Sequence, residues 1–374
     1  MVDQRILYVS PNAFRGGAEK FVLDNLKLHK ESGRFEGQVL FFESGPISDE
    51  LINEGIKVHI LPFKLRMSRP LSVIRAIFFI FLLIRSEKIS LIHSTMAYAH
   101  IIVSLAALFS GVPEVWFQHG PVGNIWDRIG KLLPFKKVLF NSEFLKNEHS
   151  KIFGPNFDED SLVLPLGVEV SSETDLNPKD FNINKDQKVL LWIGRICVGK
   201  GLHLAIEALG HLDQRDDWHF LVVGDATSKE DQSYLKKINQ RILGLNLDKK
   251  VSIIHGQKKM SRFYNISHAL IHSAVIPESF GLVVAEALGH GLFVVASSHG
   301  GVAGLVGNNI RGILYDSFSR SASLILAGII EEYLDGRTFE VDKMGQEGIK
   351  FIKEFHTPKI MNKRLEELYS RILN

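Results

Sequence analysis

The chain has 374 residues, enough for two domains that each bury a core, and its composition, 45% hydrophobic and 23% charged, is that of a globular protein. A formal net charge of only +2 argues against nucleic acid as an obligatory partner. The single cysteine, Cys197, excludes an internal disulfide framework and a cysteine-based zinc site, and it fits a reducing cytoplasm.

The first residues, 1–5, show no secretory signal and lead directly into a strand-like segment. The most apolar window, residues 77–84, lies between Arg75 and Arg85 and is too short to span a bilayer. We therefore expect a soluble protein or one attached to a membrane face.

The first half of the chain alternates strands and helices. A strand at residues 6–10 is followed by a loop containing Gly16 and Gly17 and by a helix at about residues 18–29. Two adjacent glycines let a backbone approach a ligand closely, although the pair alone is a weak signal. Further strands are expected at residues 38–42, 58–61, 91–93, 115–118 and 137–141. This alternation predicts a mostly parallel sheet covered by helices on both faces.

A second alternation follows a polar stretch at residues 171–187, which we interpret as a linker. The strands predicted after it are residues 188–193, 218–223, 251–254, 268–273 and 292–296. The sequence thus predicts an α/β protein with two doubly wound, Rossmann-like domains, at residues 1–170 and 188–356, and a cleft between them. The apolar spacing of residues 357–374 predicts a C-terminal helix that packs toward the N-terminal domain.

The stretch at residues 277–286 carries two glutamates eight residues apart, Glu278 and Glu286. Glu278 falls in a predicted strand-to-helix loop, and Glu286 lies more than one turn into the helix that starts near Gly281. The amides of Gly281 and Leu282 would open this helix, where backbone donors and the helix dipole favour a phosphate. One anion site beside two carboxylates suits a sugar joined to a nucleotide diphosphate. The alternative is a solvated cap glutamate plus an ordinary surface glutamate.

Two cations lie at an earlier strand-to-helix junction, in the segment GRICVGKG at residues 194–201. Its glycines and lysine match the frame of a phosphate-binding P-loop, but Gly201 stands where that loop needs a serine or threonine to hold magnesium. Arg195 and Lys200 instead suit the neutralisation of a diphosphate without a metal. Taken alone, they are equally compatible with a pair of surface cations.

Together these pieces resemble the retaining glycosyltransferases of family 4, which have the GT-B fold. The resemblance covers almost the whole chain, and the order and spacing of its motifs are together specific. The resemblance implies that the C-terminal domain holds a nucleotide-sugar donor while the N-terminal domain presents the acceptor. The matching pieces are Gly16-Gly17-Ala18-Glu19, His119-Gly120, residues 165–169, Gly194-Arg195 with Lys200-Gly201, residues 221–225 and residues 277–287.

Residue by residue, the resemblance implies that Arg195 and Lys200 bind the donor diphosphate and stabilise charge on the departing nucleotide, with no metal or other cofactor. It implies that Glu278 binds hydroxyl groups of the donor sugar and that Glu286 binds those of the ribose. His119 resembles the family histidine that reaches the sugar from the N-terminal domain. The expected catalytic set is His119, Arg195, Lys200 and Glu278, and the expected donor-binding set is Gly16, Gly17, Arg195, Lys200, Glu278, Ser279, Phe280, Gly281, Leu282 and Glu286.

The sequence departs from the family pattern after Gly300 and Gly301. Family members commonly carry a Pro-Glu pair in this loop, whereas here Val302 is followed by Ala303 and Gly304. A contact that the glutamate usually makes is therefore missing or supplied elsewhere.

Residues 57–151 are basic, with 13 Lys and Arg against 5 Asp and Glu. Within them, a cationic segment at residues 64–69 precedes the apolar residues 77–84, and residues 126–137 mix aromatic and cationic side chains. Such stretches can lie on an anionic membrane surface, where each cation contributes on the order of 1 kcal/mol. The alternative is that residues 77–84 form part of a buried helix that covers a sheet.

Other candidate residues have plainer interpretations. Residues 158–160 match the D-x-D form used by metal-dependent transferases of a different fold, but they lie in a polar stretch and we interpret them as a solvated charge run. The histidines that occur singly near strands, among them His93, His255, His268 and His272, are interpreted as core or rim residues.

The sequence therefore predicts a cytoplasmic, metal-independent, retaining glycosyltransferase, at the inner face of the membrane if the basic region binds lipid. It would move a hexose-type sugar from a nucleotide-diphosphate sugar to a glycan or lipid-linked saccharide, in the synthesis of a cell-surface polysaccharide or glycolipid. Two alternatives stay open. One is a nucleotide-sugar epimerase on the same fold, which would turn over donor without an acceptor, and the other is an inactive GT-B scaffold that binds partners or nucleotide.

Overall fold

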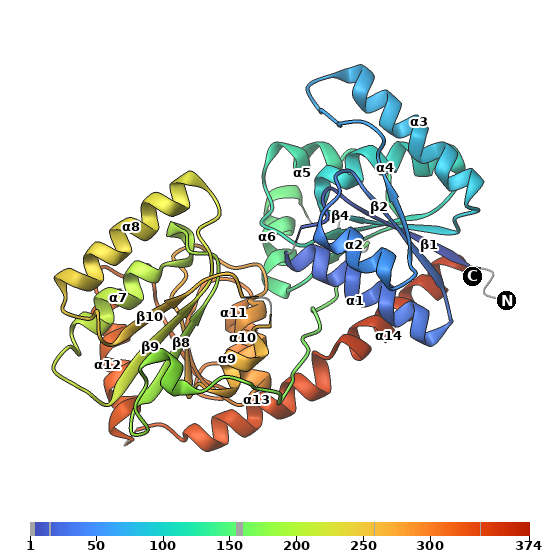
Figure 1. Ribbon diagram of the computed structural model, residues 1–374. Helices are drawn as coiled ribbons and strands as arrows, with labels where there is room; N and C mark the ends of the chain where they lie inside the picture. Colours follow the sequence, from blue (N-terminus) through green and yellow to red (C-terminus); the bar gives the residue numbers. More distant parts are fainter. Residues whose placement is uncertain (1–3, 15, 155–159, 258, 337) are drawn as a thin grey trace. The chain divides into compact units, whose positions relative to one another are not determined.

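The computed structural model describes residues 4–14, 16–154, 160–257, 259–336 and 338–374, and its chain divides into two compact units (Figure 1). Unit 1 comprises residues 1–167 and 357–374, and unit 2 comprises residues 168–356. The boundary thus falls between Gly167 and Val168, and the polar stretch at residues 171–187 belongs to unit 2. Asp158 and Glu159 of the D-x-D sequence lie outside the described residues.

Unit 1 contains a parallel sheet of seven described strands in the order β3-β2-β1-β4-β5-β6-β7. Strands β4 and β5 are buried at every residue, the pattern of strands that helices cover on both faces. The strands are β1 (Arg5–Ser10), β2 (Glu36–Phe41), β3 (Lys57–Ile60), β4 (Leu91–Thr95), β5 (Glu114–Gln118), β6 (Lys137–Phe140) and β7 (Ser161–Val163).

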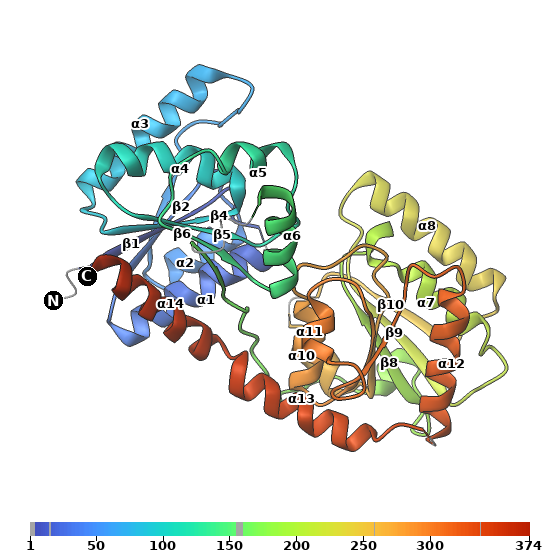
Figure 2. The same cartoon turned by 180° about the vertical axis from the view of Figure 1, so that it is seen from behind.

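Helices cover both faces of this sheet (Figures 1 and 2). On one face lie α1 (Gly17–Ser32), α2 (Pro46–Asn53) and α14 (Pro358–Leu373). On the other lie α3 (Pro70–Ser86), α4 (Met96–Ser110), α5 (Ile125–Gly130) and α6 (Glu143–Phe153). Alternation along β1 divides its side chains between the faces, because Leu7 and Val9 join the apolar cluster under α3 and α4 while Tyr8 faces α1 and α14.

The last helix, α14, joins unit 1 through buried polar contacts. The hydroxyl of Tyr369 lies 2.6 Å from Nδ1 of His93 and donates to the hydroxyl of Tyr8 at 3.1 Å. Oε1 of Glu366 lies 2.9 Å from Nδ1 of His29 on α1. These side chains are buried, so their hydrogen bonds are strengthened by the low local dielectric and fix α14 against the sheet.

Unit 2 contains a parallel sheet of six described strands in the order β10-β9-β8-β11-β12-β13. In both units the third, second and first strands precede the fourth, fifth and sixth, which is the doubly wound order. The order reverses between β1 and β4 in unit 1 and between β8 and β11 in unit 2, where such folds bind ligands. The strands are β8 (Lys188–Ile193), β9 (Trp218–Val223), β10 (Val251–Ile254), β11 (Ala269–His272), β12 (Phe293–Ser297) and β13 (Ile313–Tyr315).

Helices α7 (Leu202–Gly210), α8 (Lys229–Gly244) and α12 (Ala322–Asp335) lie on one face of the unit 2 sheet (Figure 2). On the other face lie α9 (Ser261–Asn265), α10 (Leu282–Gly289), α11 (Val302–Val306) and α13 (Val341–Phe355). Two 3₁₀ segments, η2 (Pro178–Phe181) and η3 (Val198–Lys200), stand before β8 and α7 respectively. Alternate residues of β8, Leu190 and Trp192, enter the apolar cluster beneath α7 and α12.

The prediction of an α/β protein with two Rossmann-like domains is confirmed. The apolar residues 77–84 belong to α3, which buries Ile80, Leu83 and Ile84 but leaves Phe78 and Leu82 exposed. One side of α3 therefore covers the sheet, as the second interpretation of this window expected, and the other side faces solvent. Contact of this region with a membrane stays a prediction. Among the described residues, no helix combines the length and hydropathy that crossing a bilayer requires.

Candidate functional site

Three loops meet at the carboxyl edge of the unit 2 sheet, after β8, β11 and β12. The first two are joined by the amide of Val275, which donates to the carbonyl of Gly199 at 3.0 Å. The last two are joined by the amide of Gly301, which donates to the carbonyl of Glu278 at 2.7 Å. Because β8 and β11 flank the point where the strand order reverses, these loops surround the position at which doubly wound folds bind ligands.

Two glycines allow these loops to approach so closely. Gly201 has φ +67°, and a Cβ atom there would lie 1.8 Å from the carbonyl oxygen of Ser273. Gly300 has φ +94°, and its Cβ would lie 2.2 Å from the carbonyl oxygen of Glu278. Any other residue would combine a left-handed backbone with a clash against main-chain atoms, so both positions require glycine.

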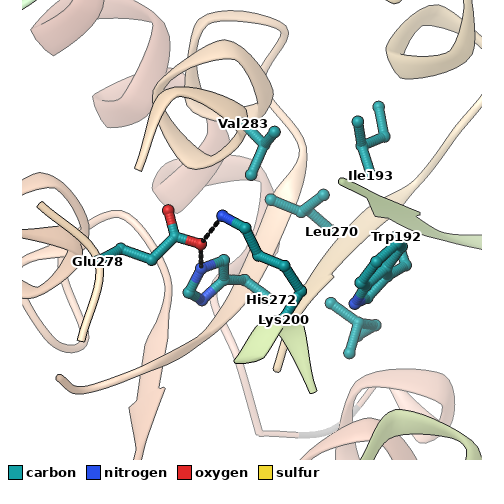
Figure 3. A pocket seen from close by; sticks show the side chains of 8 residues that line it. Trp192, Ile193, Lys200, Leu270, His272, Glu278 and Val283 are labelled. Atoms are coloured by element: carbon teal, nitrogen blue, oxygen red, sulfur yellow. Dashed lines mark hydrogen bonds and ion pairs between the residues drawn. The ribbon is translucent and has the colours of Figure 1, made fainter. Parts of the chain in front are cut away.

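The side chains of Lys200, His272 and Glu278 converge in this edge (Figure 3). Nζ of Lys200 lies 2.5 Å from Oε1 of Glu278, and Nε2 of His272 lies 3.1 Å from the same oxygen. Among the described residues Oε2 of Glu278 accepts no hydrogen bond, and Figure 3 shows it pointing away from both donors. The three side chains line a small pocket together with Trp192, Ile193, Leu270, Ile271 and Val283.

The charge of Glu278 is strongly stabilised. Burial favours the neutral acid, since the side chain is only 13% exposed, but the hydrogen bond and charge of His272 and the ammonium of Lys200 together outweigh burial. They lower the pKa of Glu278 to about 2. Glu278 is therefore a carboxylate at any working pH, and it can accept hydrogen bonds from hydroxyl groups but cannot donate a proton.

Arg195 does not join this cluster. Its side chain is 62% exposed, and Nε lies 3.9 Å from Oδ2 of Asp231 near the start of α8. The two cations predicted to act together are thus placed apart, with Lys200 paired to Glu278 and Arg195 turned toward solvent.

Glu286 lies in the second turn of α10 and is held by a residue that the sequence did not single out. The hydroxyl of Tyr264, on α9, donates to Oε2 of Glu286 at 2.8 Å. The Tyr264 ring stacks on His290 with centroids 5.0 Å apart, and Nδ1 of His290 lies 2.8 Å from the carbonyl oxygen of Glu286. Burial raises the pKa of Tyr264, and the nearby Glu286 carboxylate raises it further, so the hydroxyl remains a donor.

The residues between the two glutamates form the start of α10. Gly281, with φ +96°, stands at the N-cap, and Leu282 is the first helical residue. Phe280 is buried and packs beside His356, with ring centroids 5.8 Å apart. Ser279 is partly buried in the loop ahead of it. The helix begins directly after the loop that carries Glu278, so its first amides face the same edge of the sheet.

The departure at Gly304 leaves open space. A Cβ at this position would meet none of the described atoms within 4 Å, and Gly304 sits in α11 with its carbonyl accepting from Nη2 of Arg311 at 3.2 Å. The structure therefore places no described side chain where the family glutamate would begin.

In unit 1, the predicted residues also gather at the carboxyl edge of the sheet. His119 follows β5, and its ring lies 4.0 Å from that of Phe117 and 5.1 Å from that of Phe21 on α1, centroid to centroid. Gly16 and Gly17 begin the same helix, one turn before Phe21. The His119 side chain is buried, and neither ring nitrogen has a hydrogen-bond partner among the described residues. Burial lowers the pKa of His119 to about 3, so the ring is neutral.

Two residues that contact the predicted glutamates, His272 and Tyr264, were therefore not identified as site residues from sequence. His272 was interpreted as a core or rim histidine, and it is indeed nearly buried, but it contacts Glu278. A histidine six residues before a glutamate, at the end of an apolar strand, was the available signal. Tyr264 offered no comparable signal, because its helix has five residues and little periodicity.

Comparisons with known proteins identify the family and the fold. The model of the family described as "Glycosyltransferase Family 4" matches residues 15–172, and that of "Glycosyl transferases group 1" matches residues 173–350. The chain is a glycosyltransferase of the family 4 type. A glycosyltransferase from Rickettsia africae superposes with a TM-score of 0.86 at 20% identity, over 99% of each chain, which shows the shared GT-B fold.

Two relatives are named for a specific transfer reaction. The chain is 33% identical over 145 residues to the lipopolysaccharide 1,2-N-acetylglucosaminetransferase of Salmonella typhimurium, covering 36% of this chain and 38% of that enzyme. It is 22% identical over 332 residues, 83% of this chain and 84% of the relative, to an Escherichia coli UDP-Gal:α-D-GlcNAc-diphosphoundecaprenol α-1,3-galactosyltransferase. The chain thus matches well under half of the first enzyme. The predictions of a glycosyltransferase, a GT-B fold and family 4 are confirmed.

Proposed function

We propose that this glycosyltransferase is retaining and metal-independent and that it moves a hexose-type sugar from a nucleotide-diphosphate sugar to a glycan or lipid-linked saccharide. Unit 2 would bind the donor and unit 1 the acceptor. The reaction would serve the synthesis of a cell-surface polysaccharide or glycolipid. The two relatives support this acceptor class, because one is named for lipopolysaccharide and the other for a sugar on diphosphoundecaprenol.

The observation that carries the proposal is the pairing of Lys200 with Glu278 at the strand-order reversal of unit 2. An ammonium has three N–H donors, so the one directed at Glu278 leaves two for diphosphate oxygens. The Lys200 charge would then stabilise the departing nucleotide, together with the first amides of α10. The second oxygen of Glu278 would accept a hydrogen bond from a sugar hydroxyl. In this scheme His119 would contact the donor sugar, which would give a partner to ring nitrogens that have none among the described residues.

A ligand panel tests this proposal. Wild type and Lys200→Ala are scanned for thermal stabilisation by UDP-glucose, UDP-galactose, UDP-N-acetylglucosamine and GDP-mannose, because a ligand that binds the native state raises the melting temperature. We expect at least one donor to stabilise wild type and to stabilise the variant much less. NMR of the transfer product then reports whether the anomeric configuration is retained. Failure of every donor to stabilise wild type would contradict the proposal, and donor turnover to an epimeric nucleotide sugar without acceptor would favour the epimerase.

A surface of unit 1 supports an acceptor at a membrane. Four large apolar side chains of α3 are exposed at a spacing of three, four and four residues, which places them along one side of the helix: Leu71, Ile74, Phe78 and Leu82. Residues 55–86 contain six Lys and Arg and no Asp or Glu. The start of α3 and the cationic loop before it project beyond the rest of unit 1 (Figures 1 and 2). We propose that this helix rests on an anionic bilayer, with its apolar side in the headgroup region.

Vesicle sedimentation tests the membrane contact separately from catalysis. Wild type should sediment with phosphatidylglycerol vesicles and not with phosphatidylcholine vesicles, and binding should weaken as salt rises. The double variant Leu71→Ser and Ile74→Ser should lose most of this binding while donor stabilisation is unchanged. The control, Leu243→Ser and Leu324→Ser, removes two exposed leucines of unit 2 and should bind as wild type does. If the α3 variant binds the vesicles as well as wild type does, α3 is not the membrane contact.

A further inference from the structure

We propose that His272 is a positioning residue that fixes the carboxylate of Glu278 for the donor sugar. This inference rests on the proposed function for its consequence in catalysis, while the placement of Glu278 can be measured independently. His272 ends β11, and Glu278 follows after a loop of five residues that returns to the same place. The strand therefore holds one partner rigidly while the loop carries the other.

The hydrogen-bonding pattern around His272 is directed at Glu278 alone. Nε2 lies 3.1 Å from Oε1, and an ionised carboxylate can only accept, so Nε2 carries the hydrogen. Nδ1 is buried and has no partner among the described residues. A histidine kept only for packing leaves a buried polar nitrogen unpaired with no compensation, and an apolar side chain would fill the space without that penalty. The hydrogen bond to Glu278 thus accounts for a histidine at this position.

Lys200 and His272 contact the same oxygen of Glu278, Oε1, but they hold it with different rigidity. Lys200 is 34% exposed and has a flexible stem, whereas the His272 side chain is 5% exposed and has two rotatable bonds. When a diphosphate binds the other two N–H groups of Lys200, the ammonium is shared between two anions, whereas His272 still contacts Glu278 alone. His272 then keeps Oε1 in place and leaves Oε2 directed away from the pair (Figure 3), where it can accept from a sugar hydroxyl.

Three variants of His272 separate this role from simple packing. The amide nitrogen of a glutamine side chain can replace the Nε2 donor, that of asparagine corresponds to Nδ1, and leucine provides no donor. We expect His272→Gln to keep kcat/KM for the preferred donor within about 3-fold of wild type. His272→Leu and His272→Asn should lose about 10- to 100-fold, the effect of one hydrogen bond to a charged group. In these two variants kcat/KM for the nucleotide sugar should fall, while the affinity for the free nucleoside diphosphate should change less than about 2-fold.

A matched control lies in the same sheet. His219 is also buried, its Nε2 lies 2.9 Å from Oγ of Ser252, and its Nδ1 also has no partner among the described residues. His219 stands near the amino end of β9, opposite the site edge. We expect His219→Leu to lower the melting temperature about as much as His272→Leu does and to leave kcat/KM unchanged. An equal loss of kcat/KM in both variants would show that unit 2 is merely destabilised and would overturn the proposal.

Crystal structures of the ligand-free variants show whether His272 holds the Glu278 carboxylate, whether or not the variants are active. In His272→Leu the Glu278 carboxylate should leave its wild-type position or split between two, and in His272→Gln it should stay. An unmoved Glu278 in His272→Leu would overturn the proposal even in an active enzyme. If wild type binds no nucleotide sugar, the proposed function fails, and the same two structures still establish or refute His272 as the residue that places Glu278.

Discussion

The two sheets share one topology, yet their carboxyl edges are chemically unlike. In unit 2 the edge holds an ion pair, with Lys200 and Glu278 in contact and His272 beside them. In unit 1 the corresponding edge holds His119, buried, neutral and without a partner for either nitrogen among the described residues. The polar residues that flank it, Gln118 and Asn141, are amides, and the Gln118 amide donates to Oδ1 of the buried Asp127 at 3.2 Å.

This difference shows that the doubly wound order fixes where a ligand can bind, and that the loops decide which ligand. A charged edge that is already neutralised by its own ion pair suits a ligand carrying both charge and hydroxyl groups. A neutral ring whose nitrogens have no partner among the described residues can exchange hydrogen bonds with a sugar hydroxyl. Each prediction below tests one side of this contrast.

Removal of the Lys200 ammonium should have the largest effect. We expect Lys200→Ala to lower kcat about 10²- to 10³-fold, because the charge acts on a leaving group that becomes more negative in the transition state. Steady-state kinetics with the preferred donor measures this loss. The control Lys343→Ala removes an exposed lysine paired with Glu340 on the surface and should leave the rate unchanged. A rate for Lys200→Ala within 3-fold of wild type would show that the charged edge is not the reactive one.

The loss of the Glu278 charge should act next most strongly. Glu278→Gln keeps the shape of the side chain but removes the acceptor charge, and we expect kcat/KM to fall about 10- to 100-fold. The variant should also discriminate less between UDP-glucose and UDP-galactose, which differ in the configuration of one hydroxyl group. Competition between the two donors measures the ratio. Unaltered discrimination would argue that Glu278 does not contact the sugar.

The neutral ring of His119 should affect how stability depends on pH. His119 has a pKa of about 3 in the folded chain against about 6.5 when unfolded, so protonation favours unfolding. Its contribution to stability is complete above pH 6.5 and falls by about 1.4 kcal/mol per pH unit as the pH drops below that value. Urea unfolding of wild type and His119→Phe at pH 7.5, 6 and 5 should show a shallower decline in the variant. If the free energy of unfolding falls equally with pH in wild type and His119→Phe, the His119 ring is accessible to solvent in the folded protein.

The smallest effect is expected at Gly304. Alanine there meets no described atom within 4 Å and improves helix propensity, so Gly304→Ala should stabilise the protein by about 0.5–1 kcal/mol with unchanged kinetics. Gly201→Ala is the opposite case, since its Cβ would lie 1.8 Å from a carbonyl oxygen, and it should destabilise strongly. Chemical denaturation measures both. A loss of activity in Gly304→Ala would indicate that the departure at this position shapes the donor site.

Much of the fold could be predicted because most strands are apolar runs bounded by glycine or polar loops. The predicted segments 188–193 and 218–223 coincide with β8 and β9. Strand β13 was missed because only three residues form it, and α11 because it has five. The boundary between the units was placed a few residues late, since polar composition marks a loop but does not reveal which unit the loop packs on.

The site residues could be predicted where the alternation of strands and loops along the sequence determines their position. Lys200 and Glu278 lie in loops that the strand pattern assigns to one sheet edge, so their convergence could be anticipated. The position of Arg195 could not, because its pairing with Asp231 depends on how α8 packs. The contact between His272 and Glu278 depends on the path of the intervening loop, which no periodic pattern encodes.

The contacts of α14 bear on how the chain folds during synthesis. β1 is translated before unit 2, and the whole of unit 2 follows before α14 is made. Until then Tyr8, His29 and His93 lack the partners Tyr369 and Glu366, and the part of the sheet face that α14 covers beside α1 is bare. Unit 2 is continuous in sequence and can complete its fold earlier. Unit 1, most of which is translated before unit 2, can thus reach its final structure only after unit 2 has been made.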